Sequence, residues 1–286
     1  MTYTHIAVIG SGTMGAGIAT AAALAHRTVV LHDIEQSYLD RAHAGITRFL
    51  DGSVAKGKLE SAARDAALAR ISLSTTLDSI APCDCVIEAV PEALALKRDL
   101  FARLAQICRS DTVLATNTSS LPVTSIATAA THPERVAGLH FFNPATLMKL
   151  VEVVGGRLTD PAVVDGLMQF ARELGKTPVR VKDTPGFVVN RVARPFYNEA
   201  LRIIDEQVAA PEAVDRIMRA HGFRMGPFEL MDLIGNDVNY EVTRSLFEAF
   251  HGDPRYRPSH IQRGMVEAGL LGRKTGRGFY SHEEKA

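Results

Sequence analysis

Residues 6–35 read IAVIGSGTMGAGIATAAALAHRTVVLHDIE. The apolar run 6–9 is typical of a buried strand, and it leads into Gly10, Gly12 and Gly15 in G-x-G-x-x-G spacing. An alanine-rich helix over 15–25 and a second strand over 28–32 follow, and Asp33 comes directly after them. Strand, glycine turn, helix, strand and acidic residue together form a complete dinucleotide-binding unit.

The glycines of this unit have separate physical roles. Gly10 permits the tight turn, Gly12 lets the backbone approach a pyrophosphate, and Gly15 lets the helix pack closely on the strand. The helix N-terminus, where Thr13 and Met14 lie, offers unpaired N–H groups and a partial positive charge to the phosphates. A purely structural glycine turn is the alternative, and the flanking strand and helix make it the weaker interpretation.

Asp33 indicates which dinucleotide is bound. Its carboxylate would accept a hydrogen bond from the ribose 2′-hydroxyl and repel a 2′-phosphate. The next residues, Ile34 and Glu35, supply no arginine for such a phosphate. The sequence therefore predicts NAD as the cofactor in preference to NADP.

Composition limits the other functions. The 286 residues suffice for two domains, and the 32 basic and 32 acidic residues balance, so we expect no general attraction to nucleic acid or membranes. Cys83, Cys85 and Cys108 form neither a disulfide framework nor a zinc motif, so we interpret them as reduced structural thiols and predict no metal. Without a basic leader or an apolar run of membrane-spanning length, the chain is expected to be soluble and cytoplasmic.

The remaining pattern predicts an α/β fold in two parts. Further strand-like runs lie at 85–89, 113–116, 136–140, 150–154 and 177–181, with helical patterns such as 93–108 and 161–174 between them. This alternation predicts a Rossmann-type, doubly wound, mainly parallel sheet over residues 1–183, with an antiparallel pairing of 136–140 and 150–154 as an alternative. Residues 184–286 read as an all-helical domain, with helices at 187–205, 211–221, 227–250 and 257–268.

Ligands of doubly wound sheets bind at the carboxyl ends of the strands, which directs attention to His140. An imidazole there can accept the proton of an alcohol while hydride leaves the carbinol carbon, although a strand-end histidine with a structural role is equally consistent. Glu152, on the next strand, could hold the second ring nitrogen. Its apolar neighbours disfavour a merely solvated carboxylate.

Two more polar residues have competing interpretations. Ser119 can donate to a substrate oxygen, but Ser119 or Ser120 capping the short helix near Pro122 is the favoured reading of the spacing. Asn190 lies in the first helix of the second domain, where an asparagine is more often an ordinary surface residue. Its function does not follow from the pattern.

Several separated strings resemble one family. These strings run in order across essentially the whole chain: GSGTMGAGIA (10–19), EAVPE (88–92) with Lys97, NTSSLPVTSIA (117–127), GLHFFNP (138–144), MKLVEVV (148–154), DTPGFVVNR (183–191), GPFELMDLIG (226–235) and GRKTGRGFY (272–280). They resemble the NAD-dependent L-3-hydroxyacyl-CoA dehydrogenases, and most closely the short two-domain bacterial 3-hydroxybutyryl-CoA dehydrogenases.

The resemblance implies roles that the residues alone left open. Ser119, His140, Glu152 and Asn190 match the family's catalytic positions. His140 would remove the 3-hydroxyl proton and Glu152 would orient it, while Ser119 and Asn190 would hold the reacting oxygen or the thioester carbonyl. The helical domain resembles the family's dimerisation domain, which implies a homodimer.

The resemblance also implies ligand contacts. Glu92, Lys97, Asn143 and Lys274 match NAD-contacting positions, although Lys97 alone would be assigned to a solvated helix face. The acyl-CoA substrate would bind through Lys56, in the helical insertion where Arg48 and Lys58 are also basic. An ordinary solvated helix is equally consistent there.

The sequence differs from the family pattern at one position, and two alternative functions remain open. The family has glycine where the first helix ends, but this chain reads Ala25-His26-Arg27, so we expect the helix to end differently and the cofactor contacts to survive. A dehydrogenase of a free hydroxy acid or sugar acid, and a non-catalytic NAD-binding protein, are the alternative functions. The acyl-chain length does not follow from the sequence.

Overall fold

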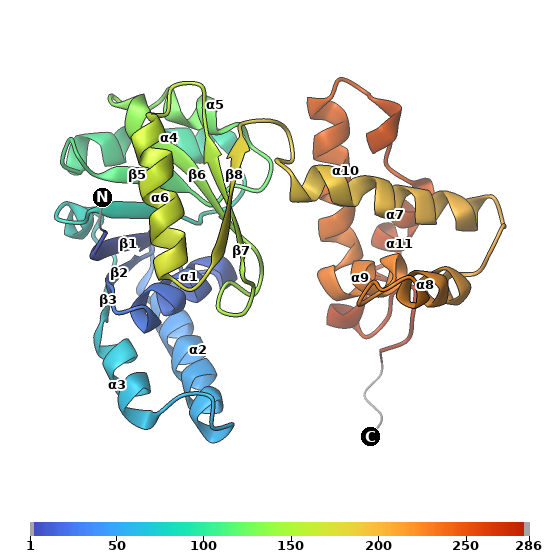
Figure 1. Ribbon diagram of the computed structural model, residues 1–286, viewed down its shortest axis with the longest axis horizontal. Coiled ribbons are helices and arrows are strands. Elements are labelled where there is room, and N and C mark those ends of the chain that lie inside the picture. The colour runs from blue at the N-terminus through green and yellow to red at the C-terminus, as the bar shows by residue number, and fades with distance from the viewer. Residues whose placement is uncertain (1–2, 283–286) are drawn as a thin grey trace. The chain divides into compact units, whose positions relative to one another are not determined.

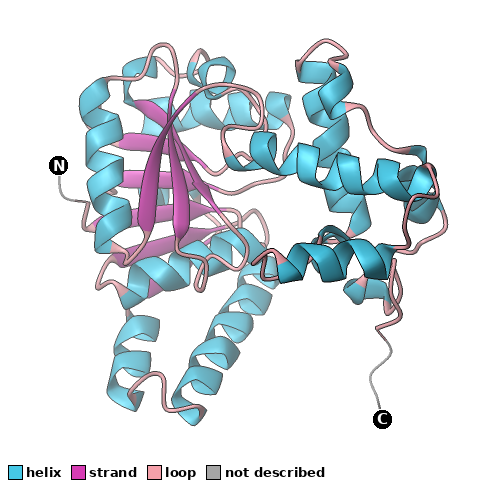
Figure 2. Cartoon of the chain, turned by 45° about the vertical axis from the view of Figure 1, so that its right-hand side comes forward, coloured by secondary structure: helices cyan, strands magenta, loops and turns pink. Residues whose placement is uncertain are grey.

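The computed structural model describes residues 3–282 and divides into two compact units between Thr184 and Pro185. All strands, drawn in magenta in Figure 2, belong to the N-terminal unit, whereas the described part of the C-terminal unit is drawn as helices and loops. The predicted fold class, a Rossmann-type sheet followed by a helical domain, is confirmed. None of the helices within residues 3–282 has the length and apolar character needed to cross a membrane.

The described part of the N-terminal unit, residues 3–184, contains one eight-stranded sheet in the order β3-β2-β1-β4-β5-β6-β7-β8. Its strands are β1 His5–Ile9, β2 Thr28–His32, β3 Ile71–Ser74, β4 Cys85–Glu88, β5 Val113–Thr116, β6 Val136–Phe141, β7 Leu150–Gly155 and β8 Thr177–Lys182. Neighbouring strands run parallel except β6 and β7, which are antiparallel. This confirms the antiparallel pairing of 136–140 and 150–154 that was given as an alternative. The short strand β3 was not predicted.

Helices cover both faces of the sheet (Figure 1). They are α1 Thr13–Leu24, α2 Gln36–Ala55, α3 Ser61–Ala69, α4 Leu94–Ile107, α5 Val123–Ala127 and α6 Pro161–Glu173. In β1, Ile6 and Val8 pack into the core with α1, α2, α3 and α6, whereas Ala7 and Ile9 pack into the core with α4 and α5. Burial of a large apolar side chain stabilises the fold by about 1.5–3 kcal/mol, so a strand that is buried on both faces of the sheet contributes to stability through the side chains of both faces.

The first helix ends in a left-handed turn despite its missing glycine. His26 has φ 64°, and its N–H donates to the Ala23 carbonyl at 3.1 Å while the Arg27 N–H donates to the Ala22 carbonyl at 3.0 Å. These two bonds form a Schellman motif, the ending that glycine favours. The expectation of a different ending was wrong, because the two bonds satisfy carbonyls that the helix would otherwise leave unpaired.

Within residues 185–282, the C-terminal unit is a cluster of five helices and short 3₁₀ turns. Its helices are α7 Val189–Asp205, α8 Pro211–Ala220, α9 Pro227–Ile234, α10 Asn236–Ala249 and α11 His260–Glu267. Tyr197, Leu201, Phe228 and Met231 form its core. The predicted single helix 227–250 was wrong: Gly235, with φ 103°, breaks it into α9 and α10, because that backbone angle lies outside the helical region.

The tail of this unit is fixed by the buried carboxylate of Asp232. Its oxygens accept from the backbone N–H groups of Phe279 and Tyr280, both at 2.9 Å, and lie 2.8 Å from His282 Nε2. A Cβ added at Gly278 would lie 2.1 Å from Asp232 Oδ1. The glycine-rich string 272–280 therefore packs on its own unit.

Candidate functional site: a cofactor turn, a buried carboxylate network and a histidine–glutamate pair

The glycine turn after β1 is built for an anionic ligand. A Cβ at Gly10 would lie 2.6 Å from the Ala89 carbonyl oxygen, and one at Gly15 would lie 1.7 Å from that of Gly10, so the fold itself requires both glycines. A Cβ at Gly12, the N-cap of α1, would meet nothing within 4 Å, and no side chain caps the helix there. The open N-terminus of α1, with Thr13 and Met14 in its first turn, fits a pyrophosphate.

Asp33, at the end of β2, holds this turn. Its Oδ2 accepts from both the backbone N–H and the hydroxyl of Ser11 at 2.7 Å, and its Oδ1 accepts from the Ile34 N–H at 2.8 Å. A carboxylate has about four acceptor positions, so these bonds leave capacity for a ribose hydroxyl. Asp33 therefore shapes the glycine turn in addition to its predicted role in cofactor choice.

The end of β4 carries a buried ion pair. Lys97 of α4 is 1% exposed and Glu88 is 0% exposed, and Lys97 Nζ lies 2.6 Å from Glu88 Oε1. Glu88 also accepts from the hydroxyl of Thr116 at 2.6 Å and from the N–H of Val90 at 2.8 Å. The interpretation of Lys97 as a solvated surface residue was wrong, because Lys97 lies on the buried face of α4 with Leu100, Phe101 and Leu104.

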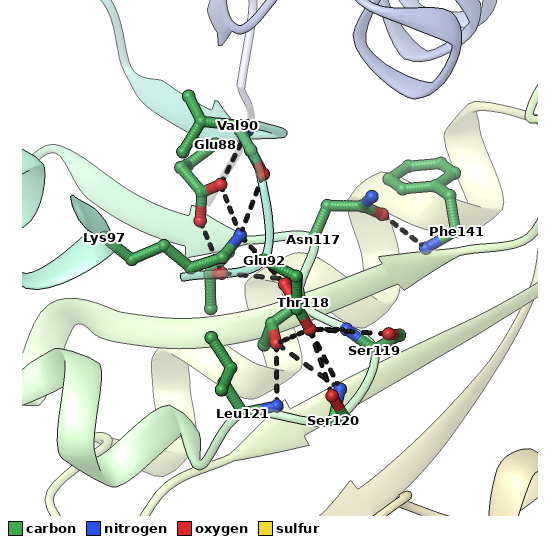
Figure 3. Close-up of polar contacts among 11 residues, drawn as sticks. Glu88, Val90, Glu92, Lys97, Asn117, Thr118, Ser119, Ser120, Leu121 and Phe141 are labelled. Carbon is green, nitrogen blue, oxygen red and sulfur yellow. Dashed lines mark hydrogen bonds and ion pairs between the residues drawn. The ribbon is translucent and has the colours of Figure 1, made fainter. Parts of the chain in front are cut away.

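Glu92 extends this network to the loop that follows β5 (Figure 3). One of its oxygens lies 3.2 Å from Lys97 Nζ, and the other accepts from the Thr118 hydroxyl at 2.6 Å and the Ser119 N–H at 2.9 Å. Burial alone would raise the pKa of Glu92, but the Lys97 charge and these hydrogen bonds bring it below its ordinary value. Lys97 and Glu92, both predicted NAD contacts, therefore also shape the loop that carries Ser119.

The predicted base and its partner face each other across β6 and β7. The two strands pair with His140 opposite Glu152, and His140 Nδ1 lies 2.8 Å from Glu152 Oε2. Both side chains are buried, at 7% and 1% exposure. The interpretation of Glu152 as a solvated strand carboxylate was therefore wrong. The carboxylate of Glu152 therefore engages Nδ1 and fixes the orientation of the imidazole ring.

Residues outside the predicted set position the segments beside this pair. The Asn117 side chain accepts from the Phe141 N–H at 2.8 Å, which joins the end of β5 to the end of β6. Lys176 is 8% exposed and donates to the carbonyls of Ala145 and Met148 at 2.5 and 3.0 Å, so it holds the β6–β7 connection. Burial and the charge of Lys149 lower the pKa of Lys176.

The favoured capping role of Ser119 or Ser120 was wrong. The helix α5 begins after Pro122 without a local side-chain cap. Its first N–H groups, those of Val123 and Thr124, donate instead to Asp183, at 2.9 and 2.7 Å. Sequence reasoning missed this cap because Asp183 lies about 60 positions away in the chain, at the end of β8.

The remaining predicted site residues lie in both units of the chain. Asn143 is exposed and precedes a cis peptide bond to Pro144, and Lys56 is exposed at the C-terminal end of α2. Asn190 lies in the first turn of α7 in the C-terminal unit. Lys274 belongs to the same unit, and its Nζ contacts both oxygens of Asp237, at 2.5 and 2.6 Å.

Family models match both units of the chain. The model of the 3-hydroxyacyl-CoA dehydrogenase NAD binding domain matches residues 5–184, and that of the 3-hydroxyacyl-CoA dehydrogenase C-terminal domain matches residues 186–282.

Two relatives and one crystal structure agree with the family assigned by these models. The chain is 52% identical over 276 residues to 3-hydroxyadipyl-CoA dehydrogenase of Escherichia coli (strain K12), covering 96% of this chain and 58% of that protein. It is 41% identical over 280 residues to 3-hydroxybutyryl-CoA dehydrogenase of Clostridioides difficile, covering 98% of this chain and 99% of that protein. The crystal structure of 3-hydroxybutyryl-CoA dehydrogenase from Escherichia coli aligns with a TM-score of 0.97 at 50% identity, covering 100% of this chain and 61% of that one.

The chain thus spans about three fifths of the length of the two Escherichia coli proteins and nearly all of the Clostridioides difficile enzyme. The expected family and the expected cofactor, NAD, are confirmed by these matches over both units. The chain belongs to the 3-hydroxyacyl-CoA dehydrogenase family, a family of NAD-dependent oxidoreductases.

Proposed function

We propose that this chain catalyses the reversible, NAD-linked oxidation of a short L-3-hydroxyacyl-CoA, such as 3-hydroxybutyryl-CoA, to the 3-ketoacyl-CoA. The observation that carries the proposal is the buried pair of His140 and Glu152, joined at 2.8 Å. A neutral imidazole fixed by a carboxylate is a suitable general base for an alcohol. The name of the Clostridioides difficile relative supports the substrate class.

His140 Nε2 takes the proton of the 3-hydroxyl group in this mechanism. Glu152 accepts from Nδ1–H, fixes the tautomer and stabilises the imidazolium that forms, as the acid does in a catalytic triad. The glycine turn and Asp33 would hold NAD, which would supply the acceptor for the hydride of the carbinol carbon. In the reverse direction, protonated His140 returns its proton to the carbonyl oxygen of the ketone.

Ser119 and Asn190 would hold the reacting oxygen or the thioester carbonyl as charge develops. The network of Glu92 and Lys97 supports the role of Ser119, because it fixes the backbone of that residue. For the cofactor, Gly12 and Asp33 would bind the pyrophosphate and the ribose, with Asn143 and Lys274 as further contacts. Lys56 would bind the coenzyme A moiety.

The first experiment follows NADH absorbance with acetoacetyl-CoA as the substrate. His140→Ala is expected to lower kcat by about 10²–10⁴-fold, because protonated His140, which acts as the general acid in this direction of the reaction, is lost. Glu152→Gln keeps the shape of the side chain but not its charge, and it is expected to lower kcat with little change in NADH affinity. An unchanged kcat in His140→Ala would reject the mechanism, and tight NADH binding without turnover of any acyl-CoA would favour a non-catalytic protein.

A carboxylated acyl chain is the second candidate substrate. The relative with 52% identity is named 3-hydroxyadipyl-CoA dehydrogenase, which would act on a chain ending in a carboxylate. Comparing kcat/KM for acetoacetyl-CoA and 3-oxoadipyl-CoA distinguishes the two acyl chains. Equal activity on the free hydroxy acid would instead support the alternative in which coenzyme A is not recognised.

We also propose that two copies of the chain associate through the helical unit and that the protein is cytoplasmic. Exposed apolar side chains on this unit support association, among them Val192, Ile217 and Phe223 at 70%, 57% and 49% exposure. Light scattering would report the mass of the protein in solution, and Ile217→Asp is expected to shift this mass to that of a monomer.

The proposed cytoplasmic location is supported by the three unpaired, buried cysteines, which fit a reducing compartment.

A further inference from the structure

Asp183 makes a compact set of contacts with the start of α5. Its Oδ1 accepts from the N–H of Val123 at 2.9 Å, and its Oδ2 accepts from the N–H and the hydroxyl of Thr124 at 2.7 and 2.5 Å. Asp183 is itself held to the sheet, because its N–H donates to the carbonyl of Gly155 at 3.2 Å. The helix start is therefore attached to the end of β8 by one carboxylate.

The loop with Ser119 is consequently held at both ends. At residues 118–120 it donates to one oxygen of Glu92, which comes from the segment between β4 and α4. At residues 123–124 it donates to Asp183. Only Leu121 and Pro122 lie between the two attached segments.

Asp183 also lies close to the boundary between the two units of the chain. The N-terminal unit ends at Thr184 and the second unit begins at Pro185, so Asp183 is the next-to-last residue of the N-terminal unit. The Thr124 hydroxyl additionally accepts from the Arg157 N–H at 2.9 Å, just beyond the strand that carries Glu152. One polar cluster thus joins the Ser119 loop, the end of β7 and the start of the connection.

We infer that Asp183 is a positioning residue for Ser119: it fixes the far end of the Ser119 loop to the point where the chain leaves the N-terminal unit. This inference rests on the proposed function, in which Ser119 contacts the reacting oxygen. A misplacement of a catalytic group by about 1 Å can lower the rate on the order of 100-fold, so loss of this anchor reduces kcat without a comparable loss of cofactor binding.

The test is a mutant cycle measured with acetoacetyl-CoA and NADH on the full chain. Asp183→Asn is expected to lower kcat about tenfold or more and to leave the Kd for NADH within about twofold. Asp160→Asn is the matched control, because Asp160 caps α6 in the same unit by accepting from the Ala162 N–H at 2.8 Å. Its kcat is expected to stay within about twofold of the parent.

The Ser119→Ala background separates positioning from general damage. If Asp183 acts through Ser119, Asp183→Asn changes kcat by less than about twofold when Ser119 is already alanine. Additive effects, or an equal loss in Asp160→Asn, would overturn the inference. A normal kcat in Ser119→Ala alone would instead reject the proposed role of Ser119, so the two failures are distinguishable.

A second variant decides the matter if Asp183→Asn does not fold. Thr124→Ala removes the hydroxyl bonded to Asp183 and leaves both backbone N–H groups in place. It is expected to give a smaller loss of kcat that also disappears in the Ser119→Ala background. Parent-like kcat in folded Thr124→Ala would then count against the inference.

Discussion

Replacing Lys97 by methionine tests the buried ion pair most directly. The substitution keeps the length of the side chain but leaves the carboxylate of Glu88, which is 0% exposed, without its cation at 2.6 Å. Removing one partner of a buried pair costs about 3–5 kcal/mol. Glu88 retains donors from Val90 and Thr116, so we expect the lower end of this range, about 3 kcal/mol.

Urea unfolding without cofactor, followed by circular dichroism, measures this cost. With a slope of about 2 kcal/mol per molar urea, a loss of 3 kcal/mol lowers the midpoint of the N-terminal unit by about 1.5 M. Lys274→Met is the control, because Lys274 is 44% exposed beside Asp237 and its loss is expected to cost under about 1 kcal/mol. The double variant Glu88→Gln with Lys97→Met is expected to recover more than half of the loss. A cost below about 1 kcal/mol in Lys97→Met would refute the reasoning.

Three further outcomes follow from the local chemistry. The pKa of Glu92 is lower in the folded protein than its ordinary value, so the ionised carboxylate stabilises the fold at neutral pH. This stabilisation is lost as the pH falls through the lowered pKa. The difference in unfolding free energy between the parent and Glu92→Gln is therefore expected to shrink from about pH 6 to pH 3. His26→Gly is expected to stabilise the protein by up to about 1 kcal/mol in urea unfolding, because glycine adopts the φ of 64° without strain, and a lower midpoint would contradict this. Burial raises the pKa of Cys83 to about 11, and Cys85 and Cys108 are also buried, so a disulfide reagent at pH 8 is expected to modify no thiol in the native protein and all three in urea.

The sequence predicted the elements whose signal is local. Strands such as β4 and β5 are apolar runs buried on both faces, and the glycine turn has a spacing that few other structures require. The strand β3 has four residues, ISLS, and such a short run carries little periodic signal. The break at Gly235 was missed because the apolar pattern continues on both sides of it.

Contacts in the candidate site were predictable where both residues belong to neighbouring strands and unpredictable where the partners are distant in the chain. The contact between His140 and Glu152 was expected from the strand pattern, whereas their catalytic roles stay a prediction. The burial of Lys97 had an available signal, since positions 97, 100, 101 and 104 share one face of a helix. The roles of Asp183 and Lys176 had none, because their partners lie dozens of positions away and only the folded chain brings them together.

The antiparallel pairing of β6 and β7 makes the histidine–glutamate pair depend on the number of residues within each strand. Side chains alternate between the two faces of a strand, so a single residue inserted ahead of Glu152 within β7 would send its carboxylate to the opposite face of the sheet. An insertion in the connection at residues 142–149 lengthens a loop but leaves the count along both strands unchanged. A library of insertions across residues 136–155 would therefore separate two groups: an insertion between His140 and the end of β6, or between the start of β7 and Glu152, removes the histidine–glutamate pair, and an insertion in the connection retains it.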